Sequence, residues 1–240
     1  MKIAILLYEG MTALDAVGPY DVLSRVPGTQ VVFVGKKPGP VHTDSHSLQL
    51  SVQRKLSDVP TPDMLLIPGG VLGSIAAARD RQFIDWVRTA HASSQWTASV
   101  CSGALLLGAA GLLEGLTATT HWAVQKELAR YGATYVGERV VRHGKLFTAA
   151  GVSAGIDLAL EMVIAIAGVE MAQAIQLFIE YDPHPPVATG ALHTAPQSTV
   201  TLARRLLRQA ALHETGHAVT DTLLKPFQRP IDEPPVEPVL

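Results

Sequence analysis

The chain has few of the residues that mark several classes of protein. Among its 240 residues there is one cysteine, Cys101, so no disulfide can form within the chain and a disulfide-stapled secreted domain is excluded. Lys and Arg number 19 against 21 for Asp and Glu, which leaves a net charge of −2. Nucleic acids and anionic membranes attract proteins with a clustered basic excess. We therefore expect a protein that binds no nucleic acid.

Long hydrophobic runs are also missing. Residues 92–113 carry no Asp, Glu, Lys, Arg or His, but serines and glycines interrupt them, whereas a spanning helix needs about 20 mostly apolar residues. The apolar run at residues 3–8 is too short for a signal peptide, and no small-residue cleavage site follows it. We expect a cytoplasmic protein with no membrane segment and with its single thiol free.

Short apolar runs instead alternate with segments whose apolar residues recur every three or four positions. Such runs predict buried strands, and such spacing predicts helices. The order β-α-β-β-α-β is typical of a parallel sheet with helices on both faces, in which ligands bind beyond the carboxyl ends of the strands. The predicted strands are residues 3–8, 31–34, 64–67 and 98–100, and the predicted helices are residues 12–25 and 81–93.

The second half of the chain continues this pattern and then changes in composition. Nine of the 16 prolines but only two of the 20 glycines lie in the last 59 residues. We therefore predict an α/β domain over residues 1–190 and a C-terminal extension over residues 191–240, made of one amphipathic helix and a proline-rich tail. Further predicted elements are helices at 103–110, 123–131, 152–167 and 170–180, a strand at 118–120 and a hairpin at 140–148.

Cys101 stands where a short predicted strand meets a helix that opens with a serine and a glycine. This arrangement is typical of a nucleophile elbow, in which a tight turn exposes the side chain and the next backbone N–H helps to form an oxyanion hole. Amides at the start of the helix would lower the thiol pKa and favour the thiolate. The alternative is an inert buried cysteine, which is common in proteins.

Two other polar features follow predicted strands. Gly69 and Gly70 come directly after the strand at 64–67, where they allow a ligand to approach backbone amides closely; an ordinary turn is the alternative. Asp15 is a lone carboxylate in the apolar first helix, and Thr12 is the better cap for that helix. A partly buried carboxylate at this edge is a candidate proton donor or base.

These features lie in segments that, in order and spacing, resemble the DJ-1/PfpI superfamily and, within it, the branch of isonitrile hydratases. The resemblance covers about residues 1–190 and implies a flavodoxin-like α/β sandwich that forms a homodimer, with Cys101 as the reactive residue. The matching segments are LDAVGP at 14–19, LIPGG at 66–70, VCSGA at 100–104, AAGLLEG at 109–115, TTHW at 119–122, AGVSAGID at 150–157 and IEYDPHPP at 179–186.

Two positions favour the hydratase branch. Protease-like members resemble Cys-His-Gly at the elbow, whereas this chain has Ser102 after the cysteine, and relatives close to DJ-1 carry a glutamate where this chain has Asp15. The same core also resembles the sensor domain of some AraC-type regulators, but the last 59 residues are too short for their two helix-turn-helix units. A small-molecule sensor or regulatory protein, and a glyoxalase or deglycase, remain as alternative functions.

The resemblance implies a mechanism for a small-molecule substrate, without cofactor or metal. Cys101 would attack the terminal carbon of an organic isonitrile while Asp15 supplies or relays a proton. Water would then open the thioimidate to give an N-substituted formamide. Backbone amides at Gly69, Gly70 and Ser102 would hold the thiolate or a tetrahedral oxygen.

Two supporting side chains follow from the same resemblance. The Ser102 hydroxyl would orient Asp15 or the water. His121 matches a family histidine near the cysteine, although packing beside Trp122 is an equally simple role. Residues 150–156 would line the pocket, and their small side chains would leave room for a hydrophobic substituent.

One competing motif lies in the C-terminal extension. His213 and His217 fit the H-E-x-x-H pattern, in which two histidines on one helical face bind zinc and the glutamate acts as base. Gly216 interrupts this helix, only 23 residues follow, and no nearby acid has an evident scaffold as third ligand. We therefore predict no catalytic metal site.

Overall fold

A seven-stranded sheet forms the centre of the molecule. The computed structural model describes residues 1–70 and 72–224, with side chains to residue 212. The sheet has the order β10-β11-β7-β6-β1-β2-β5, and every neighbouring pair is parallel except β10 and β11. Its strands are β1 Lys2–Leu6, β2 Gln30–Gly35, β5 Arg54–Lys55, β6 Met64–Ile67, β7 Trp96–Ser99, β10 Val140–His143 and β11 Leu146–Ala149.

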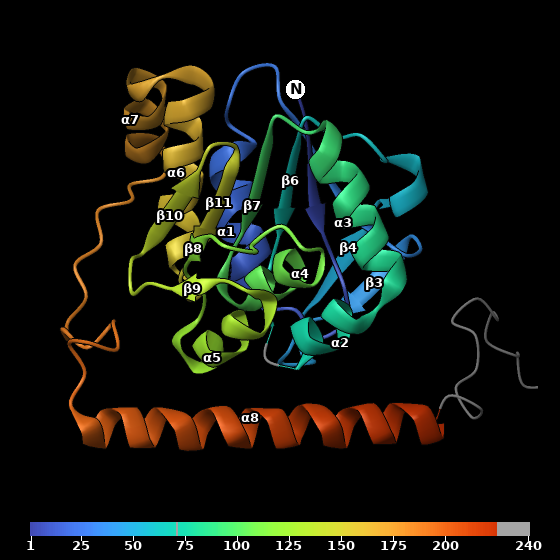
Figure 1. Cartoon of the computed structure of the whole chain (residues 1–240), viewed down its shortest axis with the longest axis vertical. Coiled ribbons are helices and arrows are strands. Elements are labelled where there is room, and N and C mark those ends of the chain that lie inside the picture. The colour runs from blue at the N-terminus through green and yellow to red at the C-terminus, as the bar shows by residue number, and fades with distance from the viewer. Residues whose placement is uncertain (71, 225–240) are drawn as a thin grey trace, which may run out of the picture.

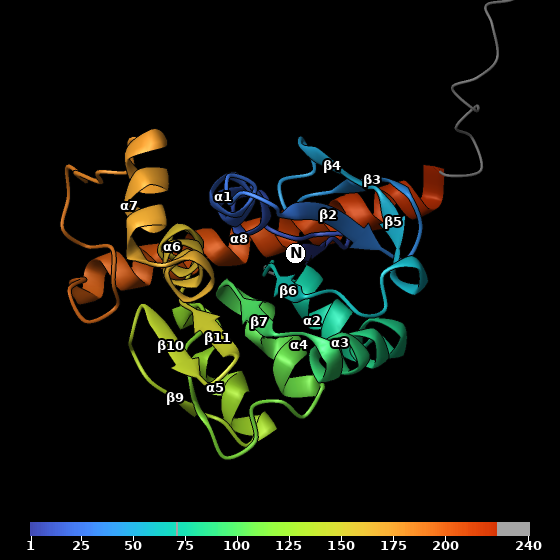
Figure 2. The same cartoon turned by 90° about the horizontal axis from the view of Figure 1, so that it is seen from above.

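Helices cover both faces of this sheet. Figure 2 shows α1 and α6 on one face and α3 and α4 on the other, and Figure 1 shows the same layers from the side. The strand residues of β6 are all buried, as expected for strands covered on both sides. The predicted flavodoxin-like α/β sandwich is confirmed. The helices are α1 Ala13–Leu23, α2 Gly73–Arg79, α3 Arg81–Ser93, α4 Ala104–Ala109, α5 Gln125–Leu128, α6 Ala154–Ala167, α7 Val169–Phe178 and α8 Gln197–Leu224.

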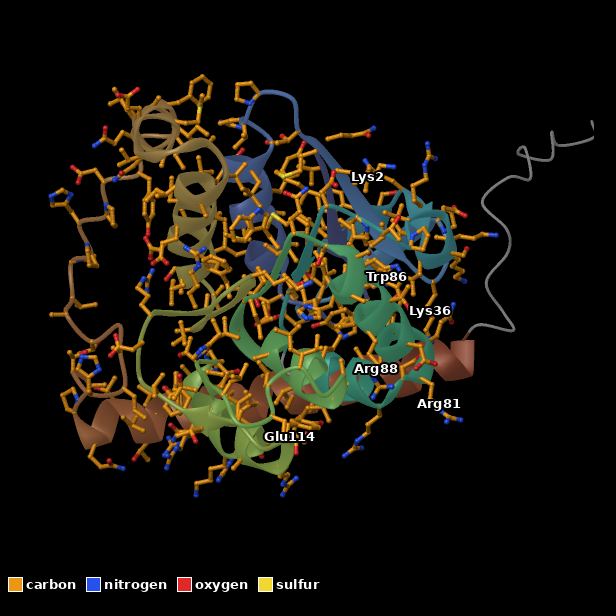
Figure 3. The ribbon with its side chains drawn as sticks, turned by 45° about the horizontal axis from the view of Figure 1, so that its top comes forward. Lys2, Lys36, Arg81, Trp86, Arg88 and Glu114 are labelled. Atoms are coloured by element: carbon orange, nitrogen blue, oxygen red, sulfur yellow. The ribbon has the colours of Figure 1, made fainter. Side chains whose placement is uncertain are left out.

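Side chains of helix α3 form hydrogen bonds to the elements around it. Figure 3 labels three of its side chains, Arg81, Trp86 and Arg88. The indole N–H of Trp86 donates to the carbonyl of Val59 at 2.9 Å. The guanidinium of Arg88 donates to the carbonyls of Ala110 and Ala109 at 3.1 and 3.3 Å, which satisfies acceptors at the end of α4. Arg88 thereby holds the far end of the helix that follows Cys101.

The structure corrects several of the predicted elements. The sequence pattern missed α2 and an antiparallel hairpin formed by β3, Gly39–His42, and β4, Gln49–Val52. The helix predicted over 123–131 is broken into α5 and two short 3₁₀ turns, and the strand predicted over 118–120 is the two-residue β8, Thr117–Ala118, paired with β9, Thr134–Tyr135. These segments are short, so their geometry depends on tertiary contacts more than on periodicity.

The C-terminal helix α8 begins after an irregular segment and lies on the α5 side of the domain (Figure 1). Val200 on α8 is buried, and a hollow of about 360 Å³ separates Leu207 and the neighbouring arginines from Gln125 and Lys126 of α5. The apolar face of the predicted amphipathic helix is only partly buried, because Leu206 is 57% exposed. The boundary at residue 190 stays a prediction. Within residues 1–70 and 72–224, no helix is long and apolar enough to cross a bilayer.

Candidate active site

Cys101 lies at a sharp turn between β7 and α4. The chain leaves β7 at Val100 and forms one 3₁₀ turn, Cys101–Gly103, before α4 begins. Cys101 has φ of +57°, a left-handed conformation that is uncommon for a residue with a side chain and is typical of strained functional turns. The side chain is 5% exposed. The geometry is that of a nucleophile elbow.

Two glycines allow the β6 loop to pack directly on this elbow. A Cβ added to Gly69 would lie 2.8 Å from Cβ of Cys101 and 2.6 Å from the backbone nitrogen of Ser102. A Cβ added to Gly103 would lie 2.3 Å from the carbonyl oxygen of Ile67. The approach of the loop after β6 to the thiol therefore requires glycine at both positions.

Asp15 reaches the same site from the first turn of α1. Its side chain is fully buried, and its Oδ2 accepts a hydrogen bond of 2.9 Å from the Gly69 N–H. Oδ1 is buried and makes no hydrogen bond of standard geometry within the described residues. The Cys101 thiol is the side chain that stabilises the charged carboxylate. The structure thus brings Asp15, Gly69 and Cys101 together from three elements.

Burial changes the acidity of both groups. It raises the pKa of Asp15 to about 7, an effect that the negative charge of Asp44 increases and that the Gly69 N–H and the Cys101 thiol oppose. Burial also raises the pKa of the Cys101 thiol well above its ordinary value, and the Asp15 carboxylate adds to this rise. The expectation of a lowered thiol pKa is therefore wrong. The N–H groups of Val152 and Ser102 lower the thiol pKa as expected, but desolvation raises it by more.

The amides of Gly69 and Gly70, expected to be free for an anionic oxygen, already have acceptors. The Gly69 N–H donates to Asp15, and the Gly70 N–H donates to the Ser102 hydroxyl at 3.0 Å. Ser102 in turn donates to the Gly70 carbonyl at 2.9 Å, so its hydroxyl is engaged with Gly70 rather than with Asp15. In this structure both amides therefore orient side chains of the site.

Ser74, in the first turn of α2, is a site residue that the sequence pattern did not reveal. It is fully buried, and its hydroxyl lies 2.9 Å from the Ser102 hydroxyl and also bonds the Gly70 carbonyl. Ser74, Ser102 and the Gly70 peptide thus form one buried hydrogen-bonded cluster. A serine in an unpredicted helix gives no signal by itself, because only the fold brings it beside Ser102.

His121 supports the far side of the site. Its ring is half-buried, and burial lowers its pKa. A Cβ added to Gly151 would lie 2.5 Å from the ring, so His121 packs against the loop whose Val152 N–H reaches the thiol. Within the described residues no hydrogen bond joins His121 to Cys101. The neighbouring Thr120 hydroxyl instead donates to the Cys101 carbonyl at 2.8 Å.

The structure also bears on the metal motif of the extension. Helix α8 continues through residues 213–217, but the side chains of His213 and His217 lie outside those that the structure describes. Among the side chains that are described, no group of three or more His, Cys, Asp or Glu residues is placed to hold a metal ion. The candidate site therefore consists of the elbow, the acid on α1 and the glycine loop between them.

Comparison with known proteins identifies the family. The model of the DJ-1/PfpI family matches residues 1–165. The chain belongs to the DJ-1/PfpI family. It is 44% identical over 205 residues to a protein of Pseudomonas putida named isonitrile hydratase, a match that covers 85% of this chain and 89% of that relative.

Solved structures agree with this membership. A ThiJ/PfpI family protein from Pseudomonas syringae matches with a TM-score of 0.81 and 36% identity, over 89% of this chain and 90% of that one. Drosophila melanogaster DJ-1beta has the same fold, with a TM-score of 0.68 at 24% identity over 75% of this chain and 97% of that one. The resemblance seen in the sequence motifs is therefore confirmed at the level of family and fold.

Proposed function

We propose that this protein is an isonitrile hydratase, which adds water to an organic isonitrile to give an N-substituted formamide. Its similarity to the Pseudomonas putida isonitrile hydratase extends over most of both chains. The observation that carries the proposal is the buried pair formed by Asp15 and Cys101, in which the acid has a pKa of about 7. Near neutral pH such a pair retains at least one proton, because removing both would bury two negative charges together.

The first step uses that proton. The isonitrile carbon accepts a nucleophile only when it also gains a proton, so a thiol beside a carboxylate is suited to this addition. Asp15 takes the thiol proton and delivers it to the carbon while the Cys101 sulfur forms its bond to the same carbon. The product is a thioimidate, R–N=CH–S–Cys, and Asp15 is again a carboxylate.

Water completes the reaction in the second step. Asp15 removes a proton from water as the water oxygen attacks the thioimidate carbon, and Asp15 then passes this proton to the nitrogen to give R–NH–CH(OH)–S–Cys. The C–S bond then breaks as the carbonyl forms, and the hydroxyl proton passes to the sulfur, which restores the Cys101 thiol. The sum is isonitrile plus water giving formamide, with Cys101 and Asp15 unchanged.

The occupied amides of Gly69 and Gly70 are compatible with this chemistry. Acyl transfer builds negative charge on a carbonyl oxygen and requires free donors aimed at it. Addition to an isonitrile carbon builds no such oxyanion in its first step, since the carbon itself takes the proton. The two amides instead orient Asp15 and Ser102. This favours the hydratase over an acyl-transfer reaction.

The proposal includes an uncharged substrate and a site wall formed by residues 150–156. The Ala150 carbonyl accepts the Cys101 N–H at 3.0 Å, and the Val152 N–H acts on the thiol, so this loop adjoins the reacting sulfur. An apolar substituent would pack against its small side chains. No cofactor enters either step.

The proposal also includes a homodimer in the cytoplasm. Leu14, Val17 and Tyr20 of α1 are 43%, 37% and 37% exposed, and Leu48 of the hairpin tip is 48% exposed. A second copy packing on these residues would cover them. Sedimentation should then give a dimer that Val17→Glu converts to a monomer.

The cytoplasm is a reducing compartment, which would keep Cys101 as the free thiol that the mechanism needs.

Incubation with cyclohexyl isocyanide tests the proposed reaction. We expect multiple turnovers to the formamide, followed by NMR or chromatography, and loss of turnover in Cys101→Ala. Stoichiometric binding without turnover would favour the small-molecule sensor, and lactate formation from methylglyoxal would favour a glyoxalase. Turnover that persists in Cys101→Ala would refute the cysteine mechanism.

A further inference from the structure

The tip of the β3–β4 hairpin is attached to the segment that leads into α1. Thr43 at the tip is 1% exposed and pairs with Met11 in an isolated parallel bridge. The next residue along, Asp44, donates its backbone N–H to the Met11 carbonyl at 2.9 Å. These contacts hold the Asp44 backbone against Met11, which lies four residues before Asp15 in the chain.

Thr12 connects Asp44 to the candidate active site. Its hydroxyl donates to Oδ2 of Asp44 at 2.6 Å, and its N–H donates to the Gly69 carbonyl at 2.8 Å. Its carbonyl accepts the Asp15 N–H at 3.2 Å. The Gly69 N–H closes the set by donating to the Asp15 carboxylate. One residue thus joins the hairpin tip, the glycine loop and the acid.

We propose that Asp44 is a positioning residue for the reaction: held by Thr12, its negative charge favours transfer of the Cys101 thiol proton to Asp15 and so increases the fraction of thiolate. This inference rests on the proposed roles of Asp15 and Cys101. The sequence gives no sign of it, because the hairpin itself was not predicted and Asp44 lies 29 positions from Asp15.

The electrostatics of the site agree with this geometry. A like charge disfavours ionisation of its neighbour, and the Asp44 carboxylate raises the pKa of Asp15. The charged group that raises the pKa of the Cys101 thiol is Asp15. Other ionisable groups on and near the hairpin are Glu9, His42 and His46: Glu9 accepts the His42 backbone N–H and lies 3.4 Å from the His42 ring, and the His42 and His46 rings lie 6.3 Å apart.

The effect of Asp44 depends on pH in a specific way. Well below the pKa of Asp15, both groups hold protons, and the thiolate fraction depends only on the loss of one proton from Cys101. Above that pKa, one proton remains, and the thiolate fraction depends on which group keeps it. Removing the Asp44 charge would lower the fraction of molecules in which Asp15, rather than the Cys101 sulfur, holds this proton. Reactivity would therefore fall above pH 7 and stay unchanged at low pH.

Alkylation of Cys101 by iodoacetamide measures the thiolate without any isonitrile. The intact protein and Asp44→Asn should be compared from pH 5 to pH 9, with the adduct quantified by mass spectrometry. Asn retains an oxygen that accepts the Thr12 hydroxyl. We expect equal rates at pH 5 and about threefold slower alkylation of the variant at pH 8, which corresponds to about half a pH unit in the Asp15 titration.

Two further comparisons separate charge from structural damage. Asp85→Asn removes an exposed acid of α3 that pairs with Arg88, and it should match the wild type at every pH. Thr12→Val removes the hydroxyl that holds Asp44, whereas Thr12→Ser keeps it. Of these two Thr12 variants, only Thr12→Val should be alkylated more slowly than the wild type at pH 8. If Asp44→Asn does not fold, the comparison of Thr12→Val with Thr12→Ser still tests the proposal.

The outcomes separate this inference from the proposed function. Equal alkylation rates at pH 8 for the wild type, Asp44→Asn and Thr12→Val would overturn the inference, as would a loss of the same size at every pH. A pH-dependent loss in a protein that does not convert isonitriles would leave the role of Asp44 intact and refute the proposed substrate. Turnover with unchanged alkylation in the variants would do the reverse.

Discussion

The Gly69 N–H donates a hydrogen bond of 2.9 Å to Oδ2 of Asp15, although 54 positions separate the two residues in the chain. This bond stabilises the carboxylate, while burial of the side chain opposes its charge more strongly and leaves the pKa at about 7. The same glycine packs against Cys101. The loop after β6 therefore sets both the orientation of the acid and its distance from the thiol.

Asp15→Asn tests the acid directly. The amide keeps the shape and an oxygen that accepts the Gly69 N–H, but it cannot carry the proton from sulfur to carbon. We expect kcat/KM for an isonitrile to fall by about 10² to 10⁴, the usual contribution of general acid–base catalysis. Initial rates of formamide production measure this. Asp21→Asn, an exposed acid of the same helix paired with Arg25, is the matched control and should retain full activity. A fall of less than threefold in Asp15→Asn would contradict the role.

The raised pKa of Asp15 also predicts how stability depends on pH. Between pH 3.8 and about 7 the folded protein keeps a proton on Asp15 that the unfolded chain has lost. The free energy of unfolding therefore falls as pH rises through this range, by about 4 kcal/mol from this group at full ionisation. Asp15→Asn removes the effect, so urea unfolding should show that the variant gains stability relative to the wild type between pH 5 and pH 8. An unchanged difference would contradict a buried acid with a raised pKa.

Local pattern predicted the elements whose periodicity is strong. β6 and α3 have the bounds expected from apolar runs and helical spacing, and the turn at Cys101 follows from a strand, a small residue and a glycine. The β3–β4 hairpin was not predicted because each of its strands has only four residues, too few for a clear periodic pattern. Its position depends on hydrogen bonds from the Asp44 N–H to the Met11 carbonyl and from the Gly10 N–H to the His42 carbonyl, which no local rule contains.

The chemistry of the site was harder to predict than its members. Asp15, Gly69, Cys101 and Ser102 were recognised from sequence, and the fold brings them together. The acidity of the thiol was misjudged because desolvation depends on how many atoms surround it, a sum over α1, the β6 loop and residues 150–157. Ser74 contributes for the same reason: burial and partners are tertiary properties.

Gly69→Ala tests the need for close approach at the elbow. The added methyl would overlap the Ser102 nitrogen and Cβ of Cys101, so the loop must move and the Asp15 hydrogen bond must lengthen. We expect at least a hundredfold loss of kcat/KM, because misplacement by about 1 Å costs that much in rate. Gly137→Ala is the control: a Cβ there meets nothing within 4 Å. Equal activity of both variants would show that the loop tolerates a side chain.

Ser102 and Ser74 should differ in how much stability their hydroxyls contribute. Ser102→Ala leaves the buried Gly70 N–H without its acceptor, which costs about 1 to 3 kcal/mol. Ser74→Ala removes a hydroxyl whose partners, the Gly70 carbonyl and Ser102, still bond each other, so we expect a loss of about 1 kcal/mol. Urea unfolding at pH 6 measures both against Ser57→Ala, a change at an exposed serine that should have no effect. A larger loss in Ser74→Ala than in Ser102→Ala would show that α2, rather than the elbow, holds the Gly70 peptide in place.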